Sequence, residues 1–553
     1  MSTFTFVRCF AVACLTAGPL GFAADAGSRP ATAMVQLKDM HLVTELVSEG
    51  RSRCKIVVPE GETWDRMGRT LQTAFQTSFG VRPEMIRSND AMSGLGDGNA
   101  IVLGSADNNQ LIRRLYIKHY CFTDCEYPGK GGAEVRTIHN PLGQGRNYVL
   151  LGGSDAAGVE AALTTFITFL ADRRLAIVSD QGRSVRLARL NWSVSPHNHA
   201  EPDEARYFRE TTARLRQKLD SGVVVASVLD ACEAGMCYYQ TGRDVYGRVF
   251  RDLLLHYCDL AEPDADWVLM KKFGGDSDRY FFPLRLIPVW NLIETGDVFT
   301  DAERLRITNL LLQITRWVSR LDYFDEHTAA GKRYGWPGEI RNNHATFATL
   351  SLFNGCEYFS NYYPEAQDWT TAYANVAKIF DGQRGSYRPD DNSATYFNYA
   401  PNHFLDYLFS REDWTYMEKG KLRNIADLII MTVDNRSDLS TYGDEIEYKI
   451  GFDKGLPLLA KAAWYYKDGR YLWARDWLKR RSASVADKVE YTPMANHIAR
   501  DESKTDFTYD GWYDGPYNID LPRTPPDHLL GIKAMPMDEG LYRFARKYGT
   551  PET

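Results

Sequence analysis

Residues 332–344 (KRYGWPGEIRNNH) form the densest group of side chains in the chain that could do chemistry. The segment combines cations, aromatic rings, amides and a histidine, and an apolar, helix-like stretch follows it. An asparagine at a helix start commonly caps the helix, and the N-terminal end of a helix attracts negative charge. These residues predict a site for an anionic group, whereas simple capping beside a surface histidine is the structural alternative. The candidates are Arg333, Trp336 and Arg341 for substrate binding and Asn343 and His344 for catalysis.

The second candidate segment covers residues 384–403 and is rich in tyrosine. A tyrosine keeps its proton up to about pH 10, so it acts as a base only where nearby cations lower its pKa. Arg388 and His344 are the cations that could do this for Tyr399. Packing of the tyrosines against helices is the alternative explanation. The segment also contributes the candidate binding residues Tyr387, Arg388, Tyr396 and His403.

The third candidate segment, residues 441–449 (TYGDEIEYK), carries three carboxylates within four residues. Such a group could hold a metal ion or act as acid and base, or it could simply solvate the start of a helix. We take Glu445 as a candidate for substrate binding. The chemistry expected below requires no metal and no other cofactor.

The first third of the chain predicts a small α/β domain over residues 34–190. Apolar runs at residues 54–59, 100–104 and 148–152 are typical of buried strands. Residues 64–79 carry apolar side chains every four positions, which predicts a helix. A second helix is expected through residue 170, with Ser154 or Asp155 as its N-cap. Alternating strands and helices of this kind favour an α/β fold.

The remainder, residues 200–553, predicts a mainly helical catalytic domain that follows a linker near residues 191–202. Strand patterns are nearly absent from it, and its long loops are rich in Gly, Asp, Asn and Pro. We expect an (α/α) toroid, that is, an incomplete barrel of paired helices, because paired helices then share one core. An irregular bundle or a superhelical array is the alternative. Helices are expected at residues 203–219, 244–260, 282–295, 301–323, 345–359, 369–380, 404–408, 416–433, 450–466 and 472–481.

Composition and charge narrow the class of protein. The chain has 553 residues, 44% of them hydrophobic, and a formal net charge of −7, which gives no indication of nucleic-acid binding. A negative protein that binds a negative polymer needs a local basic patch. Residues 1–24 predict a secretory signal peptide, because a short segment with Arg8 precedes an apolar stretch too short to span a membrane. We therefore expect export to the periplasm or the medium, with no membrane span.

Seven cysteines follow the predicted signal peptide. In an oxidising compartment the pairs Cys121/Cys125 and Cys232/Cys237 could form local disulfides. Neither pair has the spacing of a zinc site. Disulfides and buried thiols are therefore both open.

Two family resemblances add to this interpretation. Asn343 and His344 at a helix start, with Tyr399 55 residues after His344, resemble the heparinase II/III and oligoalginate lyase group of polysaccharide lyases. The resemblance implies that the asparagine and histidine neutralise a uronate carboxylate and that the tyrosine is the acid and often the base. Those lyases usually continue into a C-terminal β-sandwich with a further histidine, which is not predicted here; His403 or His497 could replace it. Residues 56–61 and 147–163 resemble the non-catalytic α/β domain that precedes the catalytic domain in family 20 hexosaminidases and α-glucuronidases.

The function expected from the sequence is cleavage of a uronate-containing polysaccharide or oligosaccharide by β-elimination. A glycoside hydrolase on the same scaffold is the first alternative, with Asp390 or Asp391 paired with Glu445 or Glu447. A non-catalytic protein that binds acidic glycans is the second.

Overall fold

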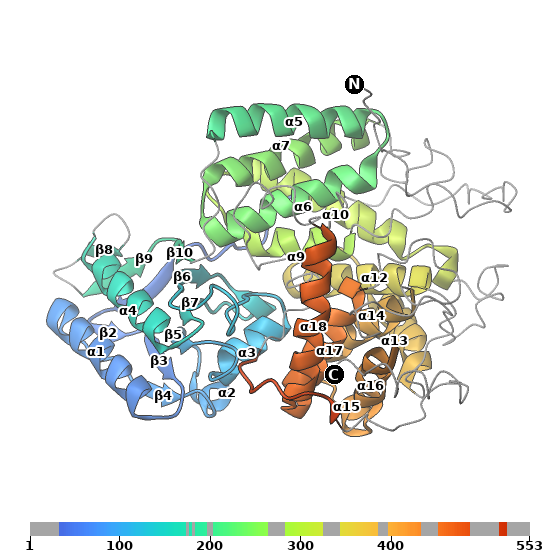
Figure 1. Ribbon diagram of the computed structural model, residues 1–553. Coiled ribbons are helices and arrows are strands. Elements are labelled where there is room, and N and C mark those ends of the chain that lie inside the picture. Colours follow the sequence, from blue (N-terminus) through green and yellow to red (C-terminus); the bar gives the residue numbers. More distant parts are fainter. Residues whose placement is uncertain are drawn as a thin grey trace, which may run out of the picture.

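The computed structural model describes residues 33–172, 176–179, 183–195, 203–263, 283–324, 343–384, 396–432, 452–486 and 519–527. The predicted signal peptide lies outside these residues. The protein is mainly helical with a small α/β region at its N-terminus, as the sequence predicts. Figure 1 shows the β-strand region on the left and the helices on the right.

A six-stranded mixed sheet forms the centre of the α/β region. Its strand order is β10-β6-β7-β5-β3-β4, in which β7, β5, β3 and β4 are parallel and β6 and β10 are antiparallel to their neighbours. The three predicted strands are confirmed as β3, β5 and β7. The predicted linker is wrong at its start, because residues 191–194 form the edge strand β10. The bounds are β3 (Cys54–Val58), β4 (Met85–Arg87), β5 (Asn99–Gly104), β6 (Ala133–Ile138), β7 (Tyr148–Gly153) and β10 (Asn191–Val194).

A smaller antiparallel sheet lies beside it, in the order β2-β1-β9-β8. Its strands are short, and they come from the first and the last parts of the α/β region in sequence. The bounds are β1 (Thr44–Ser48), β2 (Arg51–Ser52), β8 (Ala176–Ser179) and β9 (Ser184–Leu187).

Both faces of the large sheet are buried, which explains why its parallel strands are continuously apolar. Ile56 and Val58 point into a core shared with α1 (Glu62–Phe79) and α4 (Ala156–Ala171). Val57, between them, points into the opposite core, which also contains α3 (Gln110–Ile117) and the helical region. Asp155 caps α4 as predicted, because its side chain accepts a hydrogen bond from the Gly158 backbone N–H at 2.8 Å. Two short turns, α2 (Ala91–Gly94) and η1 (Pro141–Gly143), complete the region.

The helical region contains helices at all ten predicted positions and one long helix, α6, that the sequence analysis missed, but the single helix predicted at residues 416–433 is two helices, interrupted at Gly420 with φ 72°. The helix α14 is much longer than the helix predicted at residues 404–408, and it begins eight residues earlier. The bounds are α5 (Glu204–Asp220), α6 (Val224–Thr241), α7 (Asp244–Ala261), α9 (Pro283–Ile293), α10 (Asp301–Val318), η4 (Asp322–Phe324), α12 (Asn343–Tyr362), α13 (Thr370–Arg384), α14 (Tyr396–Ser410), α15 (Thr415–Glu418), α16 (Lys421–Thr432), α17 (Phe452–Tyr466) and α18 (Gly469–Ala486).

Five helices, α6, α9, α12, α14 and α17, pack side by side in this order and are called the central row below. Neighbours in the row run in the same direction. On α12 and α14, Thr346 meets His403, and further along both helices Phe353 meets Tyr407. The same order holds for α9 with α12, where Leu284 contacts Asn354 and, further along both helices, Glu294 contacts Tyr358. It also holds for α14 with α17, where Asp406 contacts Lys461 and, further along, Phe409 contacts Trp464. The N-terminal ends of these helices therefore lie at one side of the row.

Prolines are accommodated inside three central-row helices, at Pro288, Pro401 and Pro457. Each is the sixth residue of its helix, so its missing N–H leaves one carbonyl in the first turn without its usual donor. For Pro288 this carbonyl belongs to Leu284, and Asn354 Nδ2 of α12 donates a hydrogen bond to it at 3.0 Å. The bond replaces the lost helical partner and joins α9 to α12.

The α/β region packs against the C-terminal ends of the central row. Such ends carry a partial negative charge, and cations stabilise them. Lys118 Nζ donates a hydrogen bond to the carbonyl of Ser410, the last residue of α14, at 2.6 Å. The C-terminal ends of the other four helices are contacted in the same way. Asn191 contacts Tyr238 of α6, Lys38 contacts Glu294 after α9, Tyr120 contacts Tyr362 of α12, and Arg113 contacts Trp464 of α17.

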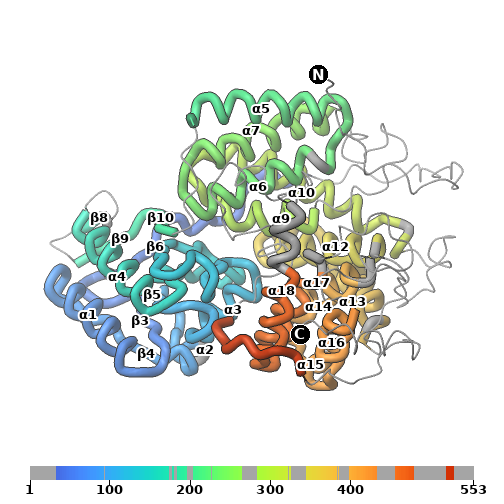
Figure 2. Tube along the Cα trace, viewed as in Figure 1, coloured from blue at the N-terminus to red at the C-terminus, as the bar shows by residue number. Residues whose placement is uncertain are grey.

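Residues 519–527 cross the junction of the two regions, below α3 and beside α15 (Figure 2). Arg523 pairs with Asp476 of α18 at 3.0 Å. Elsewhere in this segment, Asp520 lies close enough to Asp107 of the α/β region to raise the pKa of the Asp107 carboxyl, although burial is the main cause of the rise to about 6. Residues 519–527 therefore contact both regions.

The seven cysteines that follow the predicted signal peptide are free thiols, which agrees with the thiol alternative and not with the disulfide alternative. Six are buried, and Cys125 is half-buried. Burial raises the pKa of Cys54 and Cys258 to about 12, which keeps these sulfurs protonated. Among the described helices, none is both long and apolar enough to cross a membrane.

Candidate functional site

Two catalytic candidates lie at the N-terminal ends, here called the heads, of α12 and α14, and a contact between Phe347 and Tyr399 joins these ends. Asn343 and His344 are the first two residues of α12, and the His344 side chain is half-buried. Tyr399 lies in the first turn of α14 and is also half-buried. Its ring centroid lies 5.1 Å from that of Phe347, one helical turn after His344. The two heads, 55 residues apart in sequence, are therefore neighbours in space.

His403, one turn after Tyr399 on α14, packs against both Phe347 and Tyr399. Its side chain is buried, and its Nδ1 atom lies 2.8 Å from the Thr346 hydroxyl oxygen. The imidazole packs edge-on against Phe347 at 4.2 Å and lies nearly parallel to Tyr399 at 6.1 Å, with 27° between the planes. The sequence analysis gives His403 a direct contact with substrate. Its exposed fraction of 1% instead favours a role in positioning Tyr399.

An ion pair lies one turn further along α14. Lys461 Nζ of α17 is 3.0 Å from Asp406 Oδ1, and the two side chains are 0% and 5% exposed. Burying two charges costs several kcal/mol for each ion, so such a pair persists only where each charge compensates the other. The pair fixes α14 against α17 directly below His403.

The other site candidates cannot be placed in the same detail. The side chains of Asn343 and Tyr396 are not described, although these residues begin α12 and α14. Six more lie outside the described residues: Arg333, Trp336, Arg341, Tyr387, Arg388 and Glu445. Four carboxylates of the hydrolase alternative, Asp390, Asp391, Glu445 and Glu447, also lie outside them. Within the described part of the chain, no three His, Cys, Asp or Glu side chains gather in a way that could hold a metal ion.

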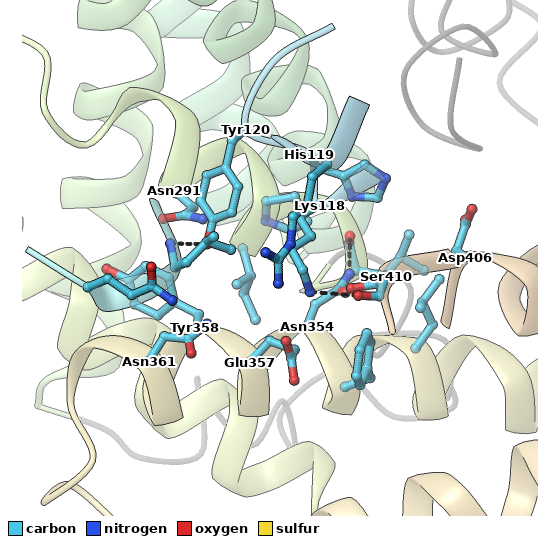
Figure 3. Close-up of a pocket in the computed structure, with 18 residues that line it drawn as sticks. Lys118, His119, Tyr120, Asn291, Asn354, Glu357, Tyr358, Asn361, Asp406 and Ser410 are labelled. Carbon is cyan, nitrogen blue, oxygen red and sulfur yellow. Dashed lines mark hydrogen bonds between the residues drawn. The ribbon is translucent and has the colours of Figure 1, made fainter. Parts of the chain in front are cut away.

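A cavity of about 200 Å³ lies between the α/β region and the central row, and the sequence analysis did not anticipate it. Lys118, His119 and Tyr120 reach it from the end of α3, facing Asn354, Glu357 and Asn361 of α12 (Figure 3). Asn291 of α9 and Asp406 of α14 also line it. Glu357 follows His344 by thirteen residues, about 20 Å along the helix axis. Leu350 and Asp406 of the lining lie nearer these helix ends, but none of His344, Tyr399 and His403 lines the cavity.

His119 is held in a conformation that histidine rarely adopts. It follows the last turn of α3 with φ 61°, the left-handed conformation in which glycine usually ends a helix. The Tyr120 backbone N–H donates to the Leu115 carbonyl at 2.8 Å and closes the turn. Side chains in this conformation cost roughly 1–2 kcal/mol. The Nε2 atom is buried and has no hydrogen-bond partner among the described residues.

Histidines with buried ring nitrogens are expected to make the protein less stable in acid. Burial, more than the charges of Lys461 and Lys118, lowers the pKa of His119 to about 4. Burial also lowers the pKa of His139 to about 3. A histidine in the unfolded chain has a pKa of about 6.5, so below that pH the unfolded state binds more protons than the folded state. The free energy of unfolding should therefore fall between about pH 6.5 and pH 4, by roughly 3 kcal/mol for each histidine.

Urea unfolding midpoints near pH 7 and near pH 4.5 measure this loss. His119→Asn keeps a residue that tolerates the left-handed turn and removes the titrating group. It should be less sensitive to acid than the unaltered protein. An identical pH dependence in the two proteins would show that His119 accepts a proton in the folded state.

Because the helices of the central row are parallel, the heads of α12 and α14 lie in a region of positive electrostatic potential. Each parallel helix places roughly half a positive charge at its N-terminal end. Several such ends lie at one side of the row, while Lys118 and Lys38 bind near the opposite, negative ends. The head side therefore favours an anionic ligand despite the net charge of −7.

No protein-family model matches the chain, and no curated protein matches its sequence.

Proposed function

We propose that the protein is a polysaccharide lyase that cleaves a uronate-containing polysaccharide or oligosaccharide by β-elimination. The observation that carries the proposal is the contact between the first turns of α12 and α14. There, Tyr399 lies 5.1 Å from Phe347, one turn from His344. A phenol and an imidazole at neighbouring helix heads can act on one sugar ring.

In this reaction the Asn343 amide and the His344 imidazole donate hydrogen bonds to the uronate carboxylate. They stabilise the enolate-like charge that develops when the proton on carbon 5 is removed. Tyr399, deprotonated near cations, accepts that proton. The bond between carbon 4 and the glycosidic oxygen then breaks, a double bond forms between carbons 4 and 5, and Tyr399 returns the proton to the leaving oxygen. One residue serving as base and acid fits a syn elimination.

The electrostatics of the central row also support an acidic substrate. The parallel helix heads supply positive potential at the side where His344 and Tyr399 lie. This potential meets the need for a local positive patch on a negative protein.

We further propose that the two layers of helices close into an incomplete (α/α) toroid. The helices of the central row run parallel, and α7, α10, α13 and α16 pack beside them. On α10 and α12, Thr308 lies near Tyr358 and Thr315 near Gly355, so the order of contacts is reversed and these two helices are antiparallel. Parallel inner helices with antiparallel outer partners are the arrangement that such a toroid requires.

Ultraviolet absorbance tests the proposed reaction. Elimination creates a conjugated, unsaturated uronate, whereas hydrolysis creates none. The full chain, incubated with a panel of alginate, heparan sulfate, hyaluronan and pectate, is expected to produce this absorbance with at least one polymer. New reducing ends without the absorbance would instead support the glycoside hydrolase, and binding without any product would support the glycan-binding protein.

A further inference from the structure

The cavity between the two regions has no role in the reaction proposed above. Its lining has two sides with different character. Ile287, Leu350 and Phe353 provide apolar surface, while Asn291, Asn354 and Glu357 provide amide and carboxylate groups. A pyranose ring has the same division, with C–H groups on its faces and hydroxyl groups around its edge. At about 200 Å³, the cavity is sized for a single ring rather than a polymer.

Charges around the cavity are already balanced. Lys118 donates to the Ser410 carbonyl and lies within the electrostatic reach of Glu357. Arg114 lies 3.3 Å from Glu412, and Asp406 pairs with Lys461. A charged ligand would therefore bring a charge that nothing in the lining compensates, which is costly in a buried site. An uncharged ligand avoids this cost.

Several polar atoms remain able to accept hydrogen bonds from hydroxyl groups. The Nδ2 atom of Asn354 donates to Leu284, which leaves its Oδ1 atom facing a different direction. One carboxylate oxygen of Glu357 accepts from the Tyr373 hydroxyl at 2.8 Å, and a carboxylate has capacity for more. The buried Nε2 atom of His119 has no partner among the described residues. These acceptors suit a ligand that donates hydrogen bonds through hydroxyl groups.

We propose that this cavity binds one uncharged pyranose sugar, whose hydroxyl groups donate hydrogen bonds to Glu357, Asn354 and His119. His119 lines the cavity from the α/β region, whereas Asn354 and Glu357 line it from α12, so the binding site needs both regions. The proposal does not rest on the lyase reaction, because the cavity and the helix heads use different residues.

Titration calorimetry with the full chain tests the proposal, with D-glucose, D-galactose, D-mannose and sodium D-glucuronate as separate probes. A ligand of this size is expected to bind in the millimolar range. At least one neutral hexose should bind with one site per chain. Glucuronate should bind more weakly by about tenfold, because its carboxylate faces Glu357 without a free cation.

Two variants locate the site, and a third is a matched control. Glu357→Gln keeps an acceptor for Tyr373 and should weaken hexose binding by about tenfold, since hydrogen bonds to charged groups are the stronger ones. His119→Gly removes one acceptor and should also weaken binding, while the relief of the left-handed backbone offsets part of the stability that is lost with the ring's packing near Phe122. His41→Gly is the control, because His41 also has a positive φ, 46°, and does not line the cavity.

Three results would overturn the proposal. These are no binding by any of the hexoses, glucuronate binding as tight as that of the best hexose, and unchanged hexose affinity in both cavity variants. None of them bears on the absorbance assay, so the two proposals can fail separately.

Discussion

Replacing Tyr399 with phenylalanine is expected to lower the turnover of a cleaved uronate polymer by at least about 10³-fold, because one phenol provides both proton transfers. The ring itself should stay in place. It packs 5.1 Å from Phe347 and 6.1 Å from His403, and phenylalanine keeps these contacts. The affinity for substrate should therefore change little. Initial rates of absorbance increase, together with the KM, measure the effect.

Tyr407→Phe is the matched control for this variant. Tyr407 lies on the same helix, eight residues later, and its ring stacks on Phe380 with 4.8 Å between centroids. The same hydroxyl is lost in both variants, but Tyr407 is buried away from the helix heads. Its activity should match that of the unaltered protein. A Tyr399→Phe protein as active as this control would remove Tyr399 from the mechanism.

Lys461→Met is expected to destabilise the protein by about 3–5 kcal/mol, because it leaves the buried carboxylate of Asp406 without its countercharge. The two groups lie 3.0 Å apart, and both side chains are almost inaccessible to solvent. The midpoint of urea unfolding near neutral pH measures the change. The double variant Lys461→Met/Asp406→Asn removes both charges and should recover most of the loss.

An exposed ion pair supplies the comparison. Arg206 and Glu210 lie 3.1 Å apart on α5, but their side chains are 68% and 60% exposed. Arg206→Met should therefore cost no more than about 1 kcal/mol. If Lys461→Met costs as little as Arg206→Met, the Lys461–Asp406 pair does not stabilise α14 against α17. If the double variant loses as much stability as Lys461→Met alone, the loss comes from the packing of the lysine side chain rather than from its charge.

Amphipathic patterns in the sequence predicted most helices because each such helix buries one face. The helix α6 was missed because it has no exposed face: Val228, Leu229 and Ala234 are all buried, although they point in different directions around the helix. A helix that is apolar on all sides lacks the 3.6-residue period that identifies amphipathic helices. Its position in the central row, with neighbours on several sides, explains the pattern only after the fold is known.

The first turns of α14 were left outside the predicted helix for a different reason. Pro401, with Asn398 and Asn402 near it, is typical of a turn, and proline inside a helix removes a hydrogen bond. Tertiary packing overrides this local preference, since Phe347 of α12 lies against Tyr399 and His403. The pairing of α12 with α14 could be predicted from family resemblance, but not from the local sequence.

The cavity could not be predicted, because its lining comes from segments more than a hundred residues apart. Lys118 and His119 belong to the end of α3, whereas Asn354 and Glu357 belong to α12. A histidine at the position where glycine usually ends a helix was the available signal. It becomes visible only once the end of α3 is known.

The apolar core beneath the large sheet continues without interruption into the helices. Val57 and Val102 of the sheet belong to the same cluster of buried side chains as Trp290 and Leu405. Arg475 of α18 and Glu126 of the α/β region add a two-pronged ion pair with both distances at 2.7 Å. The boundary between the two regions is thus part of the protein's interior. A gene rearrangement that moved one region without the other would expose this apolar surface to water, so neither region can be transferred alone.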